Sequence, residues 1–195
     1  MTSSRRPETG AIMPFASARQ WETWLAKHHK TSDGLWIKLY KKGADTPSVT
    51  YAEALDVALC YGWIDSQKQA CDAHAWLQRF TPRRARSGWS KKNVHHAERL
   101  IAAGRMKAAG MKEVEAAQAD GRWTAAYDSA TTMTFPEEFL AALRKDTRAR
   151  EHFETLNRTN RYAIAYRLQT AKTDATRARR LAVILEKLRK GEMWH

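Results

Sequence analysis

The chain has 195 residues, of which 43% are hydrophobic and 28% charged, so it is long enough to bury a core as one globular domain with or without a helical appendage. Its two cysteines, Cys60 and Cys71, are too few for a disulfide framework. No apolar run approaches the ~18 residues of a membrane span, and the N-terminal segment lacks a signal-peptide core. We therefore expect a cytoplasmic protein without a transmembrane segment.

The formal net charge of +13 predicts an anionic partner rather than a particular fold. Nucleic acid, an anionic membrane surface and acidic metabolites or proteins all fit this charge. A merely basic soluble protein fits it equally well, so the charge alone leaves these alternatives open.

The first predicted elements are an arm, a helix and a strand. Residues 1–14 are polar and show no periodicity, which indicates a disordered arm. Ser17 and Gln20 have the spacing of a capping box, in which two side chains satisfy free backbone donors at a helix start. After that helix, residues 35–40 read LWIKLY, and this alternating run of β-forming residues predicts a strand.

A second helix and a hairpin follow. Thr50 and Glu53 form another capping box, and Gly62 stands where a glycine commonly ends a helix. Residues 63–69 and 75–81 then read as two strands that pair as a hairpin. The pattern predicts an antiparallel sheet of three or four strands.

The rest of the chain is predicted to be helical after Ser87, apart from a linker over residues 123–135. Pro136 stands at a helix start, where proline is favoured, and amphipathic patterns continue to residue 190. The fold class is therefore α+β and mostly helical, with a small antiparallel sheet and packed helices. We expect three parts: a disordered arm (1–14), an α+β core domain (15–130) and a helical C-terminal module packed on it (131–195).

A cluster of cations before one predicted helix is the strongest functional signal. Arg83, Arg84 and Arg86 precede this helix, and Lys91 and Lys92 fall in its first turn. Cations at the positive end of a helix dipole cost stability, so their presence suggests a bound anion such as phosphate or carboxylate. The alternative is that these side chains are solvated, or pair with acids such as Glu53, Asp56 or Asp65.

The predicted ligand-binding residues follow from this cluster. We expect Arg83, Ser90, Lys91 and Asn93 to hold a small anionic ligand, Trp63 and Trp89 to form its walls, and Asp65 to orient Arg83. The alternatives are a structural ion pair for Asp65 and core positions for the tryptophans.

Other chemistry has weaker support. Cys60 near a helix end is more typical of a core residue than of a nucleophile, and Cys71 with His74 gives only two metal ligands. We predict no metal and no cofactor, and no catalytic residue can be assigned. Arginines interleaved with aromatic residues also fit nucleic acid. The basic C-terminal helix, with Arg177, Arg179 and Arg180, also fits an acidic protein partner.

The central part of the chain resembles a known family. The run from Tyr51 to Asn93 contains YAEALDVALCYGWIDSQKQ and QRFTPRRARSGWSKKN. This run resembles the YdeI/OmpD-associated proteins, also called bacteriocin-protection proteins, and the similarity extends over about residues 15–191. The matching motif positions are Glu53, Asp56, Cys60, Trp63, Asp65, Phe80, Pro82, Arg83, Ser87, Trp89, Ser90 and Asn93. The resemblance implies a link to envelope stress, cationic-peptide resistance and a porin partner, and it implies no established reaction.

Overall fold

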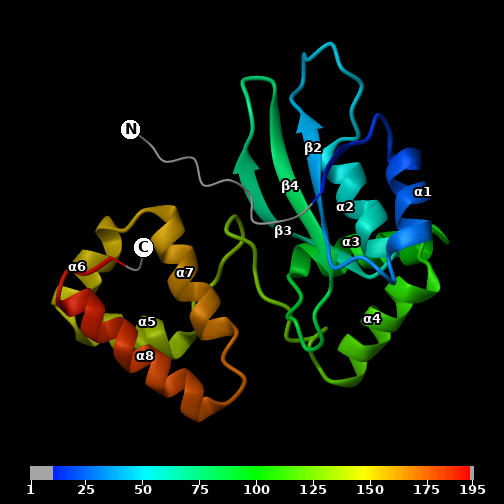
Figure 1. Cartoon of the computed structure of the whole chain (residues 1–195). Helices are drawn as coiled ribbons and strands as arrows, with labels where there is room; N and C mark the ends of the chain where they lie inside the picture. The colour runs from blue at the N-terminus through cyan, green and yellow to red at the C-terminus, as the bar shows by residue number, and fades with distance from the viewer. Residues whose placement is uncertain (1–10, 194–195) are drawn as a thin grey trace. The chain divides into compact units, whose positions relative to one another are not determined.

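A computed structural model describes residues 11–193, and Figure 1 shows it as a cartoon. The chain is α+β and mostly helical, as predicted. In chain order its elements are β1 (Ile12–Pro14), α1 (Ala18–His28), β2 (Leu35–Tyr40), α2 (Tyr51–Cys60), β3 (Trp63–Ala70), β4 (Ala75–Pro82), α3 (Lys91–Ala102), α4 (Ala108–Ala119), α5 (Glu137–Lys145), α6 (Thr147–Thr155), α7 (Arg158–Gln169) and α8 (Asp174–Arg189).

The elements group into two compact units. The sheet unit extends to Ser87 and resumes over His95–Asp120, whereas the helical unit comprises Gly88–Val94 and the chain from Gly121 onward. The sequence-based boundary near residue 130 differs from this division, because residues 121–130 and the start of α3 group with the helices of the C-terminal part.

The sheet has the strand order β1-β2-β4-β3. β4 pairs antiparallel with both β2 and β3, as the hairpin pattern predicted, but β1 pairs parallel with β2. The sheet is therefore mixed, and the expectation of a purely antiparallel sheet is corrected. The predicted disordered arm is also corrected at its end, because Ile12–Pro14 form β1. Residues 1–10 of that arm lie outside the described residues.

One face of the sheet packs on α1 and α2, which Figure 1 shows beside the strands. Trp21 of α1 is fully buried, and its ring lies 6.2 Å from that of Trp63 on β3 and 5.8 Å from that of Phe80 on β4. Its indole N–H donates to the carbonyl of Ala54 in α2 at 3.1 Å. This contact fixes both helices against the end of the sheet where β3 begins.

The helix starts largely follow the predicted caps. Thr50 and Glu53 form the complete capping box: Thr50 N–H donates to Glu53 Oε2 at 2.9 Å and Glu53 N–H to Thr50 Oγ1 at 3.3 Å. At α1, Ser17 Oγ accepts from Gln20 N–H as expected. The Gln20 side chain accepts from Ala16 N–H instead of Ser17 N–H, so only half of that box forms as predicted.

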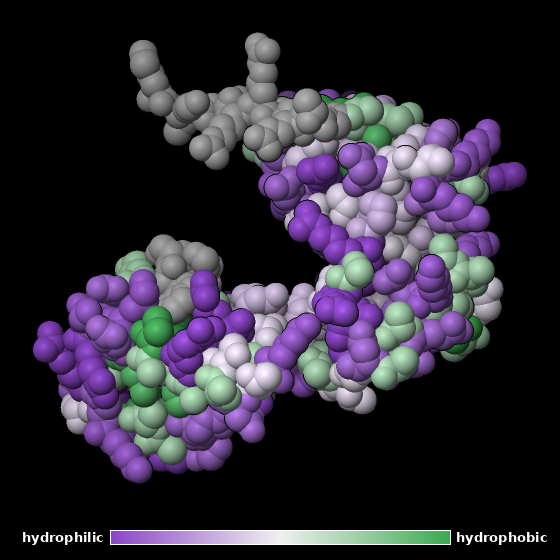
Figure 2. Space-filling view, turned by 60° about the horizontal axis from the view of Figure 1, so that its bottom comes forward, coloured by the Kyte–Doolittle hydropathy of each residue, from purple (hydrophilic) through white to green (hydrophobic). Residues whose placement is uncertain are grey.

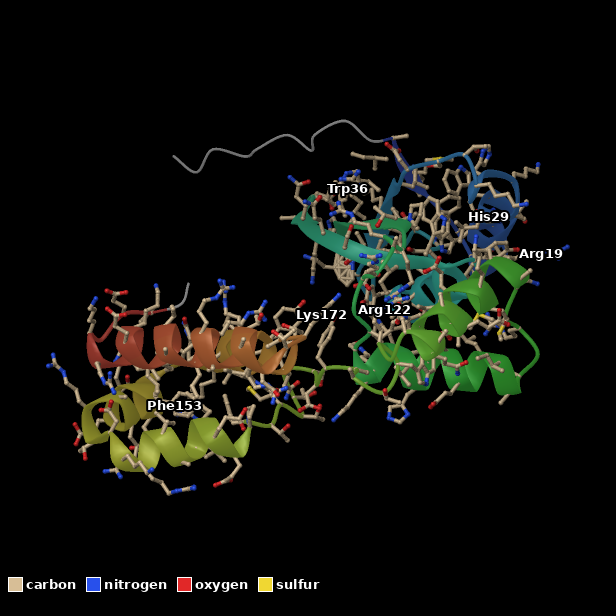
Figure 3. All side chains as sticks on the ribbon, turned by 90° about the horizontal axis from the view of Figure 1, so that it is seen from below. Arg19, His29, Trp36, Arg122, Phe153 and Lys172 are labelled. Carbon is tan, nitrogen blue, oxygen red and sulfur yellow. The ribbon has the colours of Figure 1, made fainter. Side chains whose placement is uncertain are left out.

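The helical unit has its own apolar core, built from α5, α6, α7 and α8 around Phe139, Ile164 and Ile184. Phe153, labelled in Figure 3, lies with its ring 5.3 Å from Phe139. Ile184 and Leu188 of α8 are buried, in agreement with the amphipathic pattern of this part of the sequence. On the face shown in Figure 2, apolar side chains of this unit lie among hydrophilic ones.

Candidate functional site

The sheet unit contains a cavity of about 640 Å³ at the end of the sheet where β3 begins and β4 ends. The ends of α1 and α2 and the start of α4 complete its wall. Its lining residues are His29, Lys30, Tyr61, Gly62, Trp63, Pro82, Arg83, Lys107, Ala108, Ala109, Lys112 and Glu113. Two of the predicted ligand-binding residues, Trp63 and Arg83, are therefore brought to one cavity.

The charge of this cavity is mainly positive. It is lined by Lys30, Arg83, Lys107 and Lys112, and among the described lining residues Glu113 alone is acidic. Arg83 is only 7% exposed and Lys30 and Lys112 are exposed. Lys107 Nζ lies 3.3 Å from Glu22 in a surface ion pair whose side chains are both more than 40% exposed, so Glu22 offsets part of the charge of Lys107. The cavity thus presents several cations to one space.

The start of α4 adds backbone donors to these side chains. Lys107 occupies the N-cap position without a side-chain cap hydrogen bond, and the first turn contains no acidic residue. The first amides of a helix have no intrahelical acceptor, and they carry the positive end of its dipole. Because Ala108 and Ala109 line the cavity, this helix start faces it.

The end of α2 also borders the cavity. Its last backbone carbonyl groups accept hydrogen bonds within the protein, so they present little negative charge to the cavity. The carbonyl of Cys60 accepts from Lys107 N–H at 3.1 Å, and that of Leu59 accepts from Gly62 N–H at 3.1 Å. Gly62 itself accepts from Arg83 N–H at 3.0 Å. The cavity is therefore bordered by the start of α4, which has no side-chain cap, and by the end of α2, whose carbonyl groups are already hydrogen-bonded.

Aromatic side chains form part of the wall. Trp63 is 1% exposed, and its indole N–H donates to the carbonyl of His29 at 3.2 Å. The His29 ring, at the end of α1 in Figure 3, packs edge-on against Tyr61 with centroids 5.3 Å apart. Its Nδ1 lies 2.9 Å from the carbonyl of Leu25, which assigns the proton to Nδ1 in the neutral ring. The indole N–H of Trp63 and the Nδ1 of His29 are thus both held by backbone carbonyl groups at the end of α1.

Asp65 has a different partner from the predicted one. It lies on β3 opposite Phe80, and its Oδ2 accepts from the hydroxyl of Tyr51 at 2.8 Å. Among the residues that the structure describes, Tyr51 rather than Arg83 is its hydrogen-bond partner. Burial and the neighbouring carboxylate raise the pKa of Tyr51 above its usual range. Asp65 therefore holds α2 to the sheet.

Tyr51→Phe is expected to lower the free energy of unfolding by about 1 kcal/mol, because it removes one donor from a partly buried carboxylate. Urea denaturation at neutral pH measures this change. Tyr40→Phe is the matched control, since its hydroxyl makes no hydrogen bond to another described residue. Equal losses in the two variants would contradict a structural role for the Tyr51–Asp65 bond.

The other predicted ligand-binding residues, Trp89, Ser90, Lys91 and Asn93, belong to the helical unit. Ser90 Oγ accepts from Asn93 N–H at 3.2 Å and so caps α3. Lys91 N–H donates to the carbonyl of Tyr127 at 2.8 Å. Trp89 is 2% exposed, and its ring packs 4.9 Å from Trp123. These residues therefore have structural contacts at the start of α3.

The charge of Lys91 is also paired. Its Nζ lies 2.7 Å from Asp128, a carboxylate that is 3% exposed. Asp128 further accepts from Thr134 Oγ1 at 2.6 Å and from Gln169 Nε2 at 2.8 Å. This network fixes part of residues 123–135, the segment that the sequence predicts to be a linker.

The acids offered as alternative partners for the arginine cluster have other contacts. Glu53 caps α2, and Asp56 lies 2.6 Å from Arg99 and 3.0 Å from His96. Arg84 and Arg86 are exposed and form no ion pair with another described residue. The solvated interpretation therefore fits these two arginines.

The two cysteines are free thiols. Cys60 is buried, as expected for a core residue, and burial raises the pKa of its thiol. Cys71 is exposed in the hairpin loop. Within residues 11–193, no three His, Cys, Asp or Glu side chains gather closely enough to hold a metal ion.

Several residues of the cavity were not found from the sequence. Lys30, Lys107 and Lys112 come from segments far from the arginine cluster. One local signal is present in the sequence: the helical segment that begins near residue 107 has neither a capping side chain nor an acidic residue in its first turn. Such a helix start is open to an anion, but only the packing of α4 on α2 directs it to Trp63 and Arg83.

Two family models match the chain. Residues 13–113 match the model described as domain of unknown function (DUF8412). Residues 132–191 match the model described as bacteriocin-protection, YdeI or OmpD-associated. No curated protein and no solved structure matches the chain. None of the helices described here has both the length and the apolar run that crossing a bilayer requires.

The two family models match different parts of the chain. The first spans more than half of the chain and contains every residue that lines the cavity, together with the central run of 51–93. The second covers α5 to α8, so the YdeI/OmpD-associated match lies in the C-terminal part. The C-terminal part is similar to the bacteriocin-protection, YdeI or OmpD-associated model, and the chain belongs to the family described as domain of unknown function (DUF8412).

Proposed function

We propose that this protein is a stress-associated protein that binds a small anion, bearing phosphate or carboxylate groups, in the cavity of the sheet unit. One observation carries the proposal: Lys30 after α1, Arg83 after β4 and the lysines of the α4 start line a single cavity together with the uncapped start of α4. Backbone amides at a helix start and charged side chains are the donors that proteins use for such anions.

The proposed pocket lies at a different helix start from the one that the sequence predicts. The start of α3 is capped by Ser90, and Lys91 is paired with Asp128. The start of α4 has neither a cap nor an acidic residue in its first turn. The proposed pocket therefore keeps Trp63 and Arg83 and places them with the α4 start instead of the α3 start.

The wall favours a ligand with an apolar or aromatic part beside its anionic group. Trp63, Tyr61 and Pro82 line the cavity together with the cations. A nucleotide or an aromatic carboxylate would place its ring on this wall and its charge at Lys112 and the α4 amides. The description of the family model that residues 132–191 match names bacteriocin protection, and this is the support for a stress-associated role.

The test is ligand-induced stabilisation of the full chain by inorganic phosphate, pyrophosphate, AMP, ATP, citrate and benzoate. A ligand at one hundred times its dissociation constant stabilises the folded state by about 2.7 kcal/mol, which raises the melting temperature by several degrees. Calorimetric titration then gives the affinity of each ligand that raises it. We expect Lys112→Gln and Lys30→Gln each to weaken binding about fivefold through the loss of one partly exposed charge contact.

Lys27→Gln is the matched control, because Lys27 is an exposed lysine of α1 that does not line the cavity. We expect this variant to bind like the unmodified protein. The absence of stabilisation by every anion, or an equal loss in the Lys27 and Lys112 variants, would overturn the proposal.

A further inference from the structure

A groove in the helical unit runs between α7 and α8. Two adjoining hollows, of about 450 Å³ and 330 Å³, share Arg167 and Arg180 in their linings. The larger also has Tyr162 and Tyr166 in its wall, and the smaller has Arg179 and Val183. No described residue of either lining is acidic, so the groove has the electrostatic character of a binding site for a polyanion.

The arginines of this groove differ from their neighbour on the same helix. Arg177 lies 3.7 Å from Glu138 and 3.6 Å from Asp174, and it does not line the groove. Arg179, two residues on, forms no ion pair with another described residue. Arg180 donates through Nη1 to the carbonyl of Arg167 at 2.6 Å and to Thr170 Oγ1 at 3.2 Å. These bonds hold its guanidinium in the groove and leave its other donors available to a ligand.

An aromatic side chain lies beside these cations. Tyr166 is 40% exposed, although large aromatic residues are usually covered. Its ring packs edge-on against Tyr127 at 4.9 Å and lies 6.1 Å from Tyr162. The two neighbouring rings support Tyr166, so its exposed part is a fixed surface on which a planar group can stack.

We infer that this groove binds single-stranded nucleic acid, with phosphates on Arg179 and Arg180 and a base stacked on Tyr166. A positively charged groove combined with an exposed aromatic ring is the arrangement by which proteins bind single strands without sequence preference. Carboxylates of an acidic peptide use arginines but do not require the exposed ring. The bases of a duplex are stacked on each other and do not reach it. The inference is independent of the cavity in the sheet unit.

Fluorescence anisotropy with a labelled 15-nucleotide single strand, as DNA and as RNA, tests this inference on the full chain. We expect binding at low salt that weakens steeply as salt is added. Each phosphate contact contributes about 0.7 to the slope of log affinity against log salt for single strands. The double variant Arg179→Gln/Arg180→Gln is therefore expected to reduce the slope by about 1.4. Tyr166→Leu is expected to weaken binding about tenfold through the lost base stacking, and Tyr166→Phe to leave it nearly unchanged.

Three controls separate this site from general charge effects. Arg177→Gln removes the same charge from the same helix outside the groove, and Lys27→Gln removes an exposed charge of the sheet unit outside the cavity. Both are expected to bind the strand nearly as well as the unmodified protein. Arg179→Gln alone avoids the internal bonds of Arg180, so its loss of binding does not reflect misfolding.

Other outcomes overturn the inference. These are no binding at low salt, equal losses in the Arg177 and Arg179 variants, or equal binding by Tyr166→Leu and Tyr166→Phe. Competition by poly-glutamate as strong as by the unlabelled strand would identify an acidic peptide as the occupant instead. Stronger binding of a duplex of the same length would likewise contradict a single-strand site.

Discussion

Asp128→Asn is expected to lower the free energy of unfolding by about 3 kcal/mol, because a buried carboxylate loses several charge-assisted hydrogen bonds at once. Asp128 is 3% exposed and accepts from Lys91, Thr134 and Gln169. An amide of the same shape carries no charge for Lys91. The amide also has an NH2 group in place of one carboxylate oxygen. This group would lie against Lys91, Thr134 or Gln169, which are themselves hydrogen-bond donors. The variant thus leaves several polar groups of the helical unit poorly satisfied.

The same carboxylate predicts a pH dependence. Burial by itself raises the pKa of Asp128, but the hydrogen bonds from Lys91, Thr134 and Gln169 outweigh burial and hold this pKa well below its usual range. A carboxyl group with a depressed folded pKa contributes stability above its unfolded pKa of about 3.9. This contribution is lost as the pH falls toward the folded value, and the loss begins near pH 5.

Urea denaturation at pH 7, 5, 4 and 3, followed by circular dichroism, measures both effects. The unmodified protein is expected to lose stability on acidification more steeply than Asp128→Asn, which lacks the titrating group. Glu154→Gln removes an exposed carboxylate of α6 and is expected to change stability by no more than about 0.5 kcal/mol. A loss of less than 1 kcal/mol for Asp128→Asn, or parallel pH profiles, would contradict the structural role of this network.

The elements that the sequence predicted well are those whose signals are local. The Thr50–Glu53 box and the LWIKLY strand each contain their own evidence within a few residues, and the structure confirms both. β1 has no such signal. It contains three residues, and its backbone pairs with β2, which follows more than twenty residues later. A strand this short forms because its partner is already ordered, so its own composition does not reveal it.

The candidate site was predictable only in part for the same reason. Trp63 and Arg83 were found because hairpin pairing brings the start of β3 beside the end of β4. Lys107 and Lys112 join them through contact between two helix ends, which no short pattern encodes. Asp128 was missed because it stands in a segment without periodicity, where its partners Lys91 and Gln169 are each more than thirty residues away.

The contact between the two helix ends rests on a glycine. Gly110, in the first turn of α4, is buried against the last turn of α2. A Cβ atom there would lie 2.4 Å from the carbonyl oxygen of Cys60 and 2.6 Å from that of Leu59. It would also lie 2.5 Å from the sulfur of Met106, but that flexible side chain can move, whereas the two backbone carbonyls cannot move without shifting α2.

Gly110→Ala is therefore expected to destabilise the protein by about 3 kcal/mol, because backbone atoms must shift to admit the methyl group. In an open helix the same change stabilises the protein by roughly 0.5–1 kcal/mol, so the sign of the effect tests the close approach.

Gly121→Ala is the control, because Gly121 has φ +77° and no atom lies within 4 Å of the added Cβ. This variant is expected to cost only the ~1 kcal/mol of a left-handed residue. Urea denaturation compares the two, and phosphate-induced stabilisation is expected to be lost only in the Gly110 variant, whose α4 start no longer faces the cavity correctly. A neutral or stabilising Gly110→Ala would show that α2 and α4 do not meet as closely as the proposed anion site requires.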